Sequence, residues 1–155
     1  MVEIKLADKE FVENCSPVEV TTEEAEDLIK DIIPKMEEMI REIGLGLAGP
    51  QIGMAKKFFI AKDVQTEEFH TYFNARYIKD NGSRVRMEEG CLTYPDEGHH
   101  VVKRFKAIKM FYQQLEDGKL VDKVKKFKGD QAIIFQHECD HIGNGTNQPK
   151  TIYTR

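Results

Sequence analysis

Two histidines four residues apart carry the clearest chemical signal in the sequence. They stand at the ends of His-Glu-Cys-Asp-His, residues 137–141, within a segment over 131–142 that we expect to be helical. Because residues four apart lie on one face of an α-helix, the imidazoles of His137 and His141 can bind one metal ion. Glu138 follows the first histidine and is placed to move protons for a water molecule on that metal. The pattern therefore predicts a metal-dependent catalytic site.

A catalytic metal site of this type uses three protein ligands and keeps one position open. Cys139 is poorly placed as the third ligand, because two positions along a helix turn its side chain by about 200°. We interpret Cys139 as a small buried residue behind the site, and Asp140 as either a partner that orients a histidine or a surface acid. Cys91 is a further candidate, since the glycine before it lets the backbone approach a site closely.

A third segment, over 44–53, reads Gly-Leu-Gly-Leu-Ala-Gly-Pro-Gln-Ile-Gly. It does not fit a nucleotide-binding loop, because a helix rather than a strand precedes it and no Lys-Ser/Thr pair follows its glycines. Two interpretations stay open. The segment is either a tight connection, or its backbone lines a cleft into which Gln51 points its amide.

Taken together, the three segments resemble the peptide deformylase family. Its members carry Gly-φ-Gly-Leu-Ala-Ala-Pro-Gln-φ-Gly, then Glu-Gly-Cys-Leu-Ser, then Gln-His-Glu-x-x-Asp-His. The corresponding segments here are 44–53, 89–93 and 136–141, in the same order. The resemblance implies a hydrolase that removes the formyl group from N-formylmethionine at the start of new polypeptides and releases formate.

The resemblance also implies a role for each matching residue. Three residues would be the metal ligands: Cys91, His137 and His141. The metal would be Fe²⁺ natively, with Zn²⁺, Ni²⁺ or Co²⁺ able to replace it. Metal-bound hydroxide would attack the formyl carbon, with Glu138 as general base and acid. Gln51 and the backbone N–H of Leu92 would stabilise the oxyanion, and Gly46 would pair with the backbone of the substrate.

The chain departs from the family pattern at several positions. Gly49 stands where the family has a second alanine, and Asn144 stands where it has a glycine. Many members hold later substrate residues with an arginine; by plain offset that position is Gly98 here, and the alternatives nearby are Lys103 and Arg104. Only 14 residues follow His141, which resembles short phage- or organelle-type members that lack the usual C-terminal extension.

Hydrophobic patterning predicts the elements that position these segments. We expect residues 1–20 to be irregular and a long helix over 21–43 to follow, opened by a Thr21–Glu24 capping box and kinked at Pro34. A second helix over 131–142 should have Asp130 as its N-cap. Strands are predicted at 57–62, 69–74, 101–102, 107–112 and 119–127. The result is an α+β fold in a single domain over 1–155, with antiparallel strands packed around a central metal-binding His-Glu-x-x-His helix.

Composition limits the partners and the compartment. The 155 residues include 23 Lys and Arg against 27 Asp and Glu, a net charge of −4. Negative charge repels phosphate and anionic lipid, so we expect no direct nucleic-acid or membrane partner. The expected partners are N-formylmethionyl peptides or nascent chains, met by a monomer transiently close to the ribosome. No signal peptide is evident and the three cysteines are odd in number, which favours the reducing cytoplasm and leaves Cys15 without a role.

Two other functions compete with the deformylase. A zinc endopeptidase would use His137, Glu138 and His141, but its third ligand usually lies downstream, where no His or Glu follows. A non-catalytic relative would bind metal or nascent chains without hydrolysis. Glu138 and Gln51 argue against that relative, because a purely structural metal site needs neither.

Overall fold

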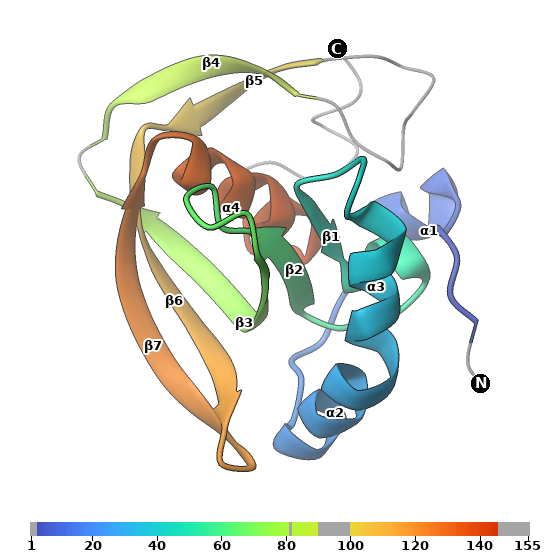
Figure 1. Ribbon diagram of the computed structural model, residues 1–155. Coiled ribbons are helices and arrows are strands. Elements are labelled where there is room, and N and C mark those ends of the chain that lie inside the picture. Colours follow the sequence, from blue (N-terminus) through green and yellow to red (C-terminus); the bar gives the residue numbers. More distant parts are fainter. Residues whose placement is uncertain (1–2, 81, 90–99, 146–155) are drawn as a thin grey trace.

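The computed structural model describes residues 3–80, 82–89 and 100–145, and these residues form an α+β fold (Figure 1). The helical segments are α1 (Lys9–Asn14), α2 (Thr22–Asp27), a π-helical segment (Leu28–Ile32), α3 (Ile33–Ile40), a 3₁₀ turn (Gly49–Ile52) and α4 (Gly129–His141). The strands are β1 (Gly46–Ala48), β2 (Phe58–Lys62), β3 (Phe69–Lys79), β4 (Arg84–Glu89), β5 (His100–Phe105), β6 (Ala107–Glu116) and β7 (Lys119–Lys128).

Within these residues the strands form two antiparallel sheets. The larger sheet has five strands in the order β1-β2-β3-β6-β7, and the smaller pairs β4 with β5. All five predicted strands are present, and β3, β5 and β6 extend further than predicted. The fold class is therefore confirmed as α+β with antiparallel strands.

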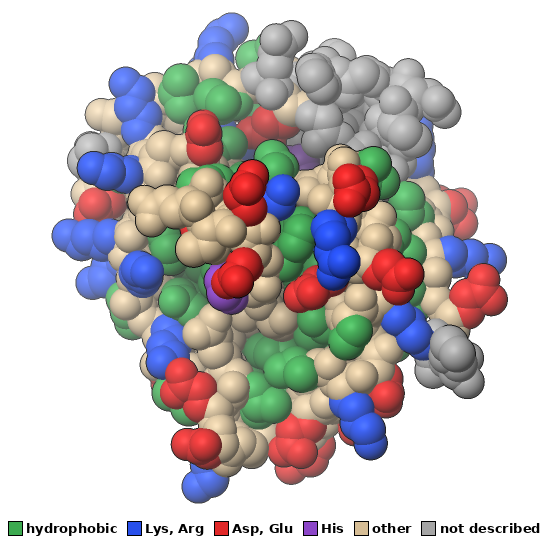
Figure 2. All heavy atoms as spheres, in the orientation of Figure 1, with side chains coloured by type: hydrophobic (Ala, Val, Ile, Leu, Met, Phe, Trp, Pro, Cys, Tyr) green, Lys and Arg blue, Asp and Glu red, His purple; other side chains and the backbone are tan. Residues whose placement is uncertain are grey.

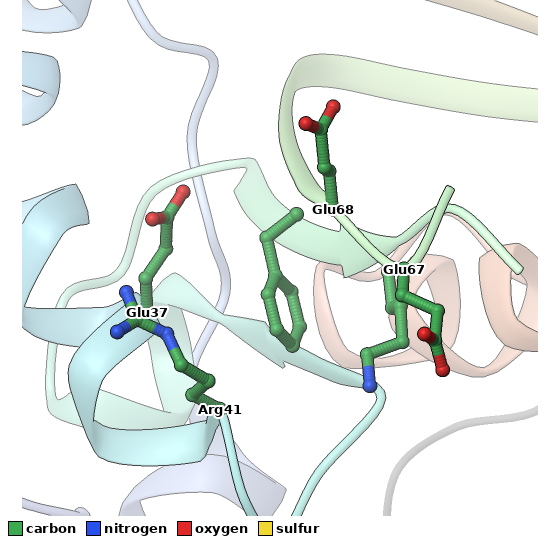
Figure 3. Close-up of a pocket in the computed structure, with 6 residues that line it drawn as sticks. Glu37, Arg41, Glu67 and Glu68 are labelled. Atoms are coloured by element: carbon green, nitrogen blue, oxygen red, sulfur yellow. The ribbon is translucent and has the colours of Figure 1, made fainter.

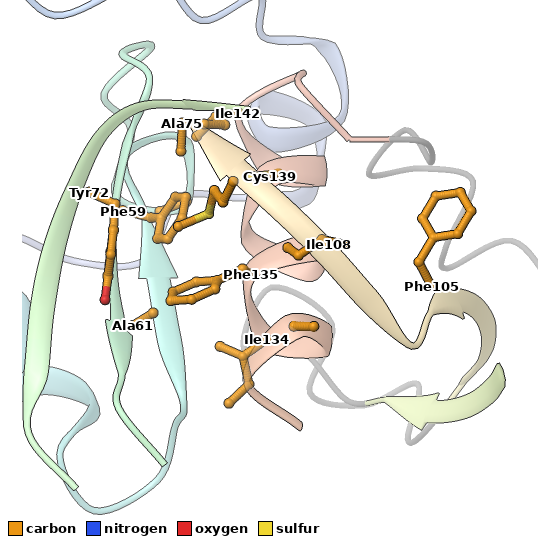
Figure 4. Close-up of a cluster of buried hydrophobic side chains, with 13 residues drawn as sticks. Phe59, Ala61, Tyr72, Ala75, Phe105, Ile108, Ile134, Phe135, Cys139 and Ile142 are labelled. Atoms are coloured by element: carbon orange, nitrogen blue, oxygen red, sulfur yellow. The ribbon is translucent and has the colours of Figure 1, made fainter. Parts of the chain in front are cut away.

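The strands β1, β2 and β3 lie between two layers of helix. Alternate residues of β2 point to opposite faces, so Phe59 and Ala61 join α4 in one hydrophobic cluster, shown in Figure 4. Phe58 and Ile60 join α2 and α3 in a second cluster on the other face. These four side chains are completely buried, so β2 contributes to both clusters. Its packing against α4 holds that helix on one face of the sheet.

The predicted long helix is present but interrupted. Thr21 and Glu24 form the expected reciprocal capping box at its start. The π-helical segment lies just before Pro34, which stands in the first turn of α3. Proline cannot donate the backbone hydrogen bond that an α-helix requires. The helix is therefore interrupted before Pro34 by the wider π-helical turn, where the sequence predicted a kink.

Two predicted boundaries are wrong. Residues 1–20 are not wholly irregular, because α1 forms there with the Asp8 carboxylate accepting a hydrogen bond from the N–H of Phe11 at 2.9 Å. Asp130 is not the N-cap of α4. The helix starts at Gly129 directly after β7, with Lys128 in the cap position, and this places Asp130 inside the first turn.

The end of α4 is fastened to the large sheet. The N–H groups of Gly143 and Asn144 donate to the carbonyls of Asp140 and Cys139, a Schellman closure. The Asn144 amide then donates to the carbonyl of Ala75 on β3 and accepts from Lys57, both at 2.9 Å. A glycine could not make these two side-chain bonds, so Asn144 gives the helix end a fixed position.

In the described part of the chain, no helix has the length and apolar character that crossing a bilayer requires.

Alanine at position 49 is expected to destabilise this chain, although the family usually has alanine there. A Cβ on Gly49 would lie 2.6 Å from the Phe58 ring and 2.9 Å from the carbonyl oxygens of Met54 and Lys56. The two backbone oxygens cannot rotate away, so we expect a loss of about 1–3 kcal/mol from the free energy of unfolding. Urea denaturation measures it, with the exposed Gln65→Ala as a control expected within about 0.5 kcal/mol of the wild type. Equal transition midpoints for Gly49→Ala and the wild type would contradict the packing described.

Candidate metal and catalytic site

The two predicted histidines meet on one face of α4. Their Nε2 atoms are 3.2 Å apart, and their ring centroids are 4.9 Å apart. Two nitrogens bound at about 2.1 Å to one tetrahedral metal ion would lie about 3.4 Å apart, so the observed spacing fits a shared cation. The spacing of four residues therefore produces the geometry expected of two ligands.

A carboxylate holds the other side of the first ring. Glu89, the last residue of β4, places Oε1 2.7 Å from Nδ1 of His137. A carboxylate at Nδ1 favours a proton on that nitrogen and leaves the lone pair of Nε2 directed at the shared position. Carboxylates of this kind support histidine ligands in many metal sites, so this contact is a second observation that fits a metal.

Arg104 on β5 connects this carboxylate to the helix. Its guanidinium donates to both oxygens of Glu89, at 2.9 and 2.8 Å, and to Oδ2 of Asp140 at 2.5 Å. The side chains of Arg104 and Asp140 are fully buried, and that of Glu89 is 10% exposed. Three charged groups therefore fix β4, β5 and α4 to one another directly behind His137.

The ionisation of this cluster follows from its contacts. Burial alone would raise the pKa of Glu89, but hydrogen bonds from Arg104 and His137 lower it to about 2. Burial alone would lower the pKa of Arg104, but the two adjacent carboxylates raise it. Glu89 is therefore an anion at neutral pH and Arg104 a cation, and each is retained inside the protein by the other.

Glu138 lies against the first strand of the large sheet. Its side chain is buried, and a Cβ built on Gly46 would lie 2.7 Å from its Oε2 and 2.8 Å from its Cδ. Only glycine leaves room for the carboxylate at this point of β1. The contact joins two sequence motifs that are about 90 residues apart and places Glu138 against the Gly46 position of β1.

Gln51 is buried in the 3₁₀ turn that follows β1. Its side-chain Oε1 accepts a hydrogen bond from the N–H of Ala48 at 2.9 Å, and its own carbonyl accepts from the N–H of Ala7 at 2.7 Å. With the oxygen end of the amide bonded to Ala48, the donor end is oriented away from that strand. The segment is thus a tight connection in which Ala48 holds the oxygen end of the Gln51 amide.

The remaining predictions divide clearly. Cys139 is buried in the cluster beneath α4, as predicted, and burial raises the pKa of its thiol. Asp140 is not a surface acid, because it is fully buried and accepts a hydrogen bond from Arg104. Arg104 is not a substrate-holding residue, because it is buried between two carboxylates. Cys91 and Leu92 lie outside the described residues.

Sequence reasoning assigned no role to Glu89 and considered Arg104 only as a residue that holds the substrate, not as the buried partner of two carboxylates. Glu89 stands two residues before Cys91 in the motif that carried the family resemblance, and that position was the available signal. Arg104 had no such signal, because its two partners are 15 and 36 residues away along the chain.

A separate surface pocket of about 390 Å³ lies apart from this group of residues. It is lined by Glu37, Arg41, Lys62, Glu67, Glu68 and Phe69. Figure 3 shows Glu37 of α3 and Arg41, which follows that helix, on one side and Glu67 and Glu68 on the other. None of these residues belongs to the predicted site.

The fold and the site together define a class of protein. An α+β domain with a His-Glu-x-x-His helix, two facing imidazoles and a buried glutamate has the arrangement of a metal-dependent hydrolase. Comparison with known proteins identifies the family within that class.

Residues 3–147 match the family model of polypeptide deformylase. A peptide deformylase of Wolbachia pipientis is 31% identical over 147 residues, covering 82% of this chain and 79% of that protein. One from Thermotoga maritima is 35% identical over 117 residues, covering 76% and 68% of the two chains. The chain belongs to the polypeptide deformylase family.

Solved structures agree with this assignment. The crystal structure of peptide deformylase from Thermotoga maritima has a TM-score of 0.76 at 27% identity and covers 94% of this chain and 95% of that one. A probable peptide deformylase from Synechococcus phage S-SSM7 has a TM-score of 0.72 at 28% identity, covering 92% and 95%. The resemblance to a phage protein thus extends over almost the whole phage chain.

Removing the buried cation should destabilise the fold strongly. Arg104→Met leaves Glu89 and Asp140 buried without their shared partner, so we expect a loss of about 3–5 kcal/mol from the free energy of unfolding. The matched control is Lys103→Met, which removes an equal charge from the adjacent, exposed position. Urea denaturation of both variants separates the two effects. Similar losses for the two variants would show that the cluster does not hold the site together.

Proposed function

We propose that this chain removes the formyl group from N-formylmethionyl peptides or nascent chains, as one catalytic domain over 1–155. It would act as a monomer in the cytoplasm, transiently close to the ribosome. The observation that carries the proposal is the meeting of two motifs: Glu138 lies against Gly46, beside two histidines whose Nε2 atoms face each other at 3.2 Å. Membership of the deformylase family supports the reaction.

We infer that Cys91, His137 and His141 hold one divalent metal ion, natively Fe²⁺. A metal bound by three ligands supplies Lewis acidity and lowers the pKa of water at its open position towards 7. The facing imidazoles and the carboxylate on His137 support the two histidine assignments. The assignment of Cys91 rests on the family motif, since an anionic thiolate beside two neutral imidazoles is a common ligand set for a borderline-soft metal.

Glu138 is the proton carrier in this proposal. It follows a ligand histidine on the same helix and is only 4% exposed. In this position the carboxylate takes the proton from the attacking water and delivers it to the amine that leaves the formyl group. Burial favours both steps, because bulk water is kept away from the transferred proton.

Gln51 and the N–H of Leu92 would stabilise the oxyanion that forms on the formyl oxygen. The hydrogen bond from Ala48 fixes the oxygen end of the Gln51 amide, so the donor end does not need to reorganise during the reaction. Preorganised donors of this type typically contribute about 10²–10³-fold to the rate.

The substrate backbone would pair with β1 at Gly46. This strand is the edge of the large sheet and pairs with β2 on one side only, within the described residues. An extended peptide can add to such an edge through main-chain hydrogen bonds. Pairing at Gly46 would place the start of the peptide directly beside Glu138.

Replacing the carboxylate of Glu138 should abolish turnover and leave metal binding intact. Glu138→Gln keeps the size of the side chain but cannot accept the proton, so we expect formate release to fall by at least about 10²-fold. The measurement uses protein prepared anaerobically with Fe²⁺, a formyl-Met dipeptide and a parallel determination of the metal per chain. Wild-type protein that binds one metal without releasing formate would identify a non-catalytic relative. Full activity of Glu138→Gln would remove this residue from the mechanism.

Gly46→Ala should lower activity without unfolding the protein. The added Cβ would collide with the end of the Glu138 side chain, which can move, and not with backbone. A displacement of the carboxylate by about 1 Å is expected to lower kcat by about 10²-fold, with a change of less than about 1 kcal/mol in stability. Formate kinetics and urea denaturation are both needed. Unchanged kcat in a folded Gly46→Ala protein would show that the position of Glu138 is not critical.

A further inference from the structure

Charge is distributed very unevenly along the chain. Residues 1–45 contain 13 acidic and 5 basic side chains, whereas residues 76–128 contain 13 basic and 8 acidic ones. The net charge of −4 is a sum over the whole chain, in which the acidic residues of the first region outweigh the basic residues of the second. The expectation of no polyanionic partner, drawn from that average, therefore has to be tested against where the basic side chains lie.

Basic and apolar residues share one face of the strands β3, β6 and β7. Cross-strand partners point to the same side of a sheet, and the register places them in two adjacent rows. One row is Arg76, Phe111 and Val124, and the other is Ile78, Lys109 and Lys126. We call these six residues the basic face.

Four of the six residues of the basic face are exposed, and Lys109 and Phe111 are half-buried. Ile78 and Val124 are 51% and 55% exposed, and the Lys126 side chain is 68% exposed. Among the described elements, α4 packs on the opposite side of the sheet, against Ile108 and Met110. Helix α2 approaches only the hairpin end of β6 and β7. Figure 2 shows Lys and Arg side chains gathered along the left margin, where β6 and β7 lie in Figure 1.

Two cations approach one aromatic ring at the centre of this face. The Arg76 guanidinium carbon is 4.4 Å from the centroid of Phe111, and the Lys109 ammonium is 5.6 Å from it. Lys126 completes the second row, with Asp80 3.6 Å away. An aromatic ring with two cations beside it on one face of a sheet combines a stacking group with charge for a phosphate backbone.

We propose that the basic face binds single-stranded RNA, with phosphates on Arg76, Lys109 and Lys126 and a base on Phe111. An acidic protein or an anionic membrane would use the same charges but has no need of the aromatic ring. Because the histidine site lies on α4, across the sheet, bound RNA leaves that site accessible. The proposal is independent of the deformylase reaction.

The test is fluorescence anisotropy of a labelled 20-nucleotide polyuridine RNA at about 50 mM salt. The Lys109→Glu/Lys126→Glu double variant should bind at least about 10-fold more weakly than the wild type. It should also lower the slope of log affinity against log salt by about 1.4, since each phosphate contact on a single strand contributes about 0.7. The control, Lys30→Glu/Lys35→Glu, changes the net charge equally on the acidic helices and should lower affinity less than about 2-fold.

Phe111→Leu tests the stacking step separately. It should weaken RNA binding by about 5-fold or more and leave the salt slope unchanged, because no charge is removed. All variants should retain wild-type thermal melting and formate release, so a failure of RNA binding is distinguishable from a failure of catalysis.

Three results would overturn the proposal. The first is wild-type protein that does not bind RNA at 50 mM salt. The second is an equal loss of affinity in both charge-reversal variants, which would reduce the effect to net charge. The third is binding to phosphatidylserine vesicles or polyglutamate as tight as to RNA, combined with no effect of Phe111→Leu.

Discussion

The buried ionic cluster of Arg104, Glu89 and Asp140 is the constraint on which the rest of the site depends. One guanidinium bonds both carboxylates, and Glu89 in turn holds the ring of His137. Burying three charges is costly, and such a group persists only when each member is fully paired. The smaller sheet and α4 therefore cannot shift relative to each other without leaving a charge unpaired inside the protein. This ionic cluster therefore fixes the position of the His137 ring.

Two glycines in one motif serve different purposes. At Gly46 the neighbouring atoms belong to the mobile end of Glu138, whereas at Gly49 two of the three are backbone carbonyl oxygens. The first glycine makes room for the Glu138 carboxylate, and the second lets the chain turn tightly. The position of Gln51 follows from this tight turn, because the turn starts at Gly49 and the Gln51 amide oxygen accepts a hydrogen bond from the N–H of Ala48. The motif thus brings β1, the proton carrier and the amide donor to one place.

Local patterns were sufficient to predict most of the fold. Strand β2 was recognisable from its apolar run, and the break near Pro34 followed from a missing backbone donor. Helix α1 was not recognisable, because six residues capped by Asp8 are too short to show a periodic stripe. Strand β4, with the sequence Arg-Val-Arg-Met-Glu-Glu, has too many charges to resemble a buried strand.

The candidate site was predictable only where its residues are close in sequence. His137 and His141 share a helix, so their spacing gives their geometry directly. Glu89 and Arg104 lie 48 and 33 residues from His137, and only the paired strands β4 and β5 bring them to it. The distribution of charge on the surface also depends on contacts between residues that are far apart in the sequence. The net value pointed away from polyanions, but the sheet gathers cations from β3, β6 and β7 on one face.

The central claim is that His137 and His141 bind a metal ion together with Cys91, and a titration with Co²⁺ under reducing, anaerobic conditions tests it most directly. Thiolate and imidazole ligands give Co²⁺ distinct absorption, so the spectrum reports the ligands independently of turnover. We predict one Co²⁺ per chain with a thiolate-to-cobalt band, loss of that band in Cys91→Ser, and loss of stoichiometric binding in His141→Ala. A spectrum without the thiolate band, or full binding by His141→Ala, would contradict the proposed site.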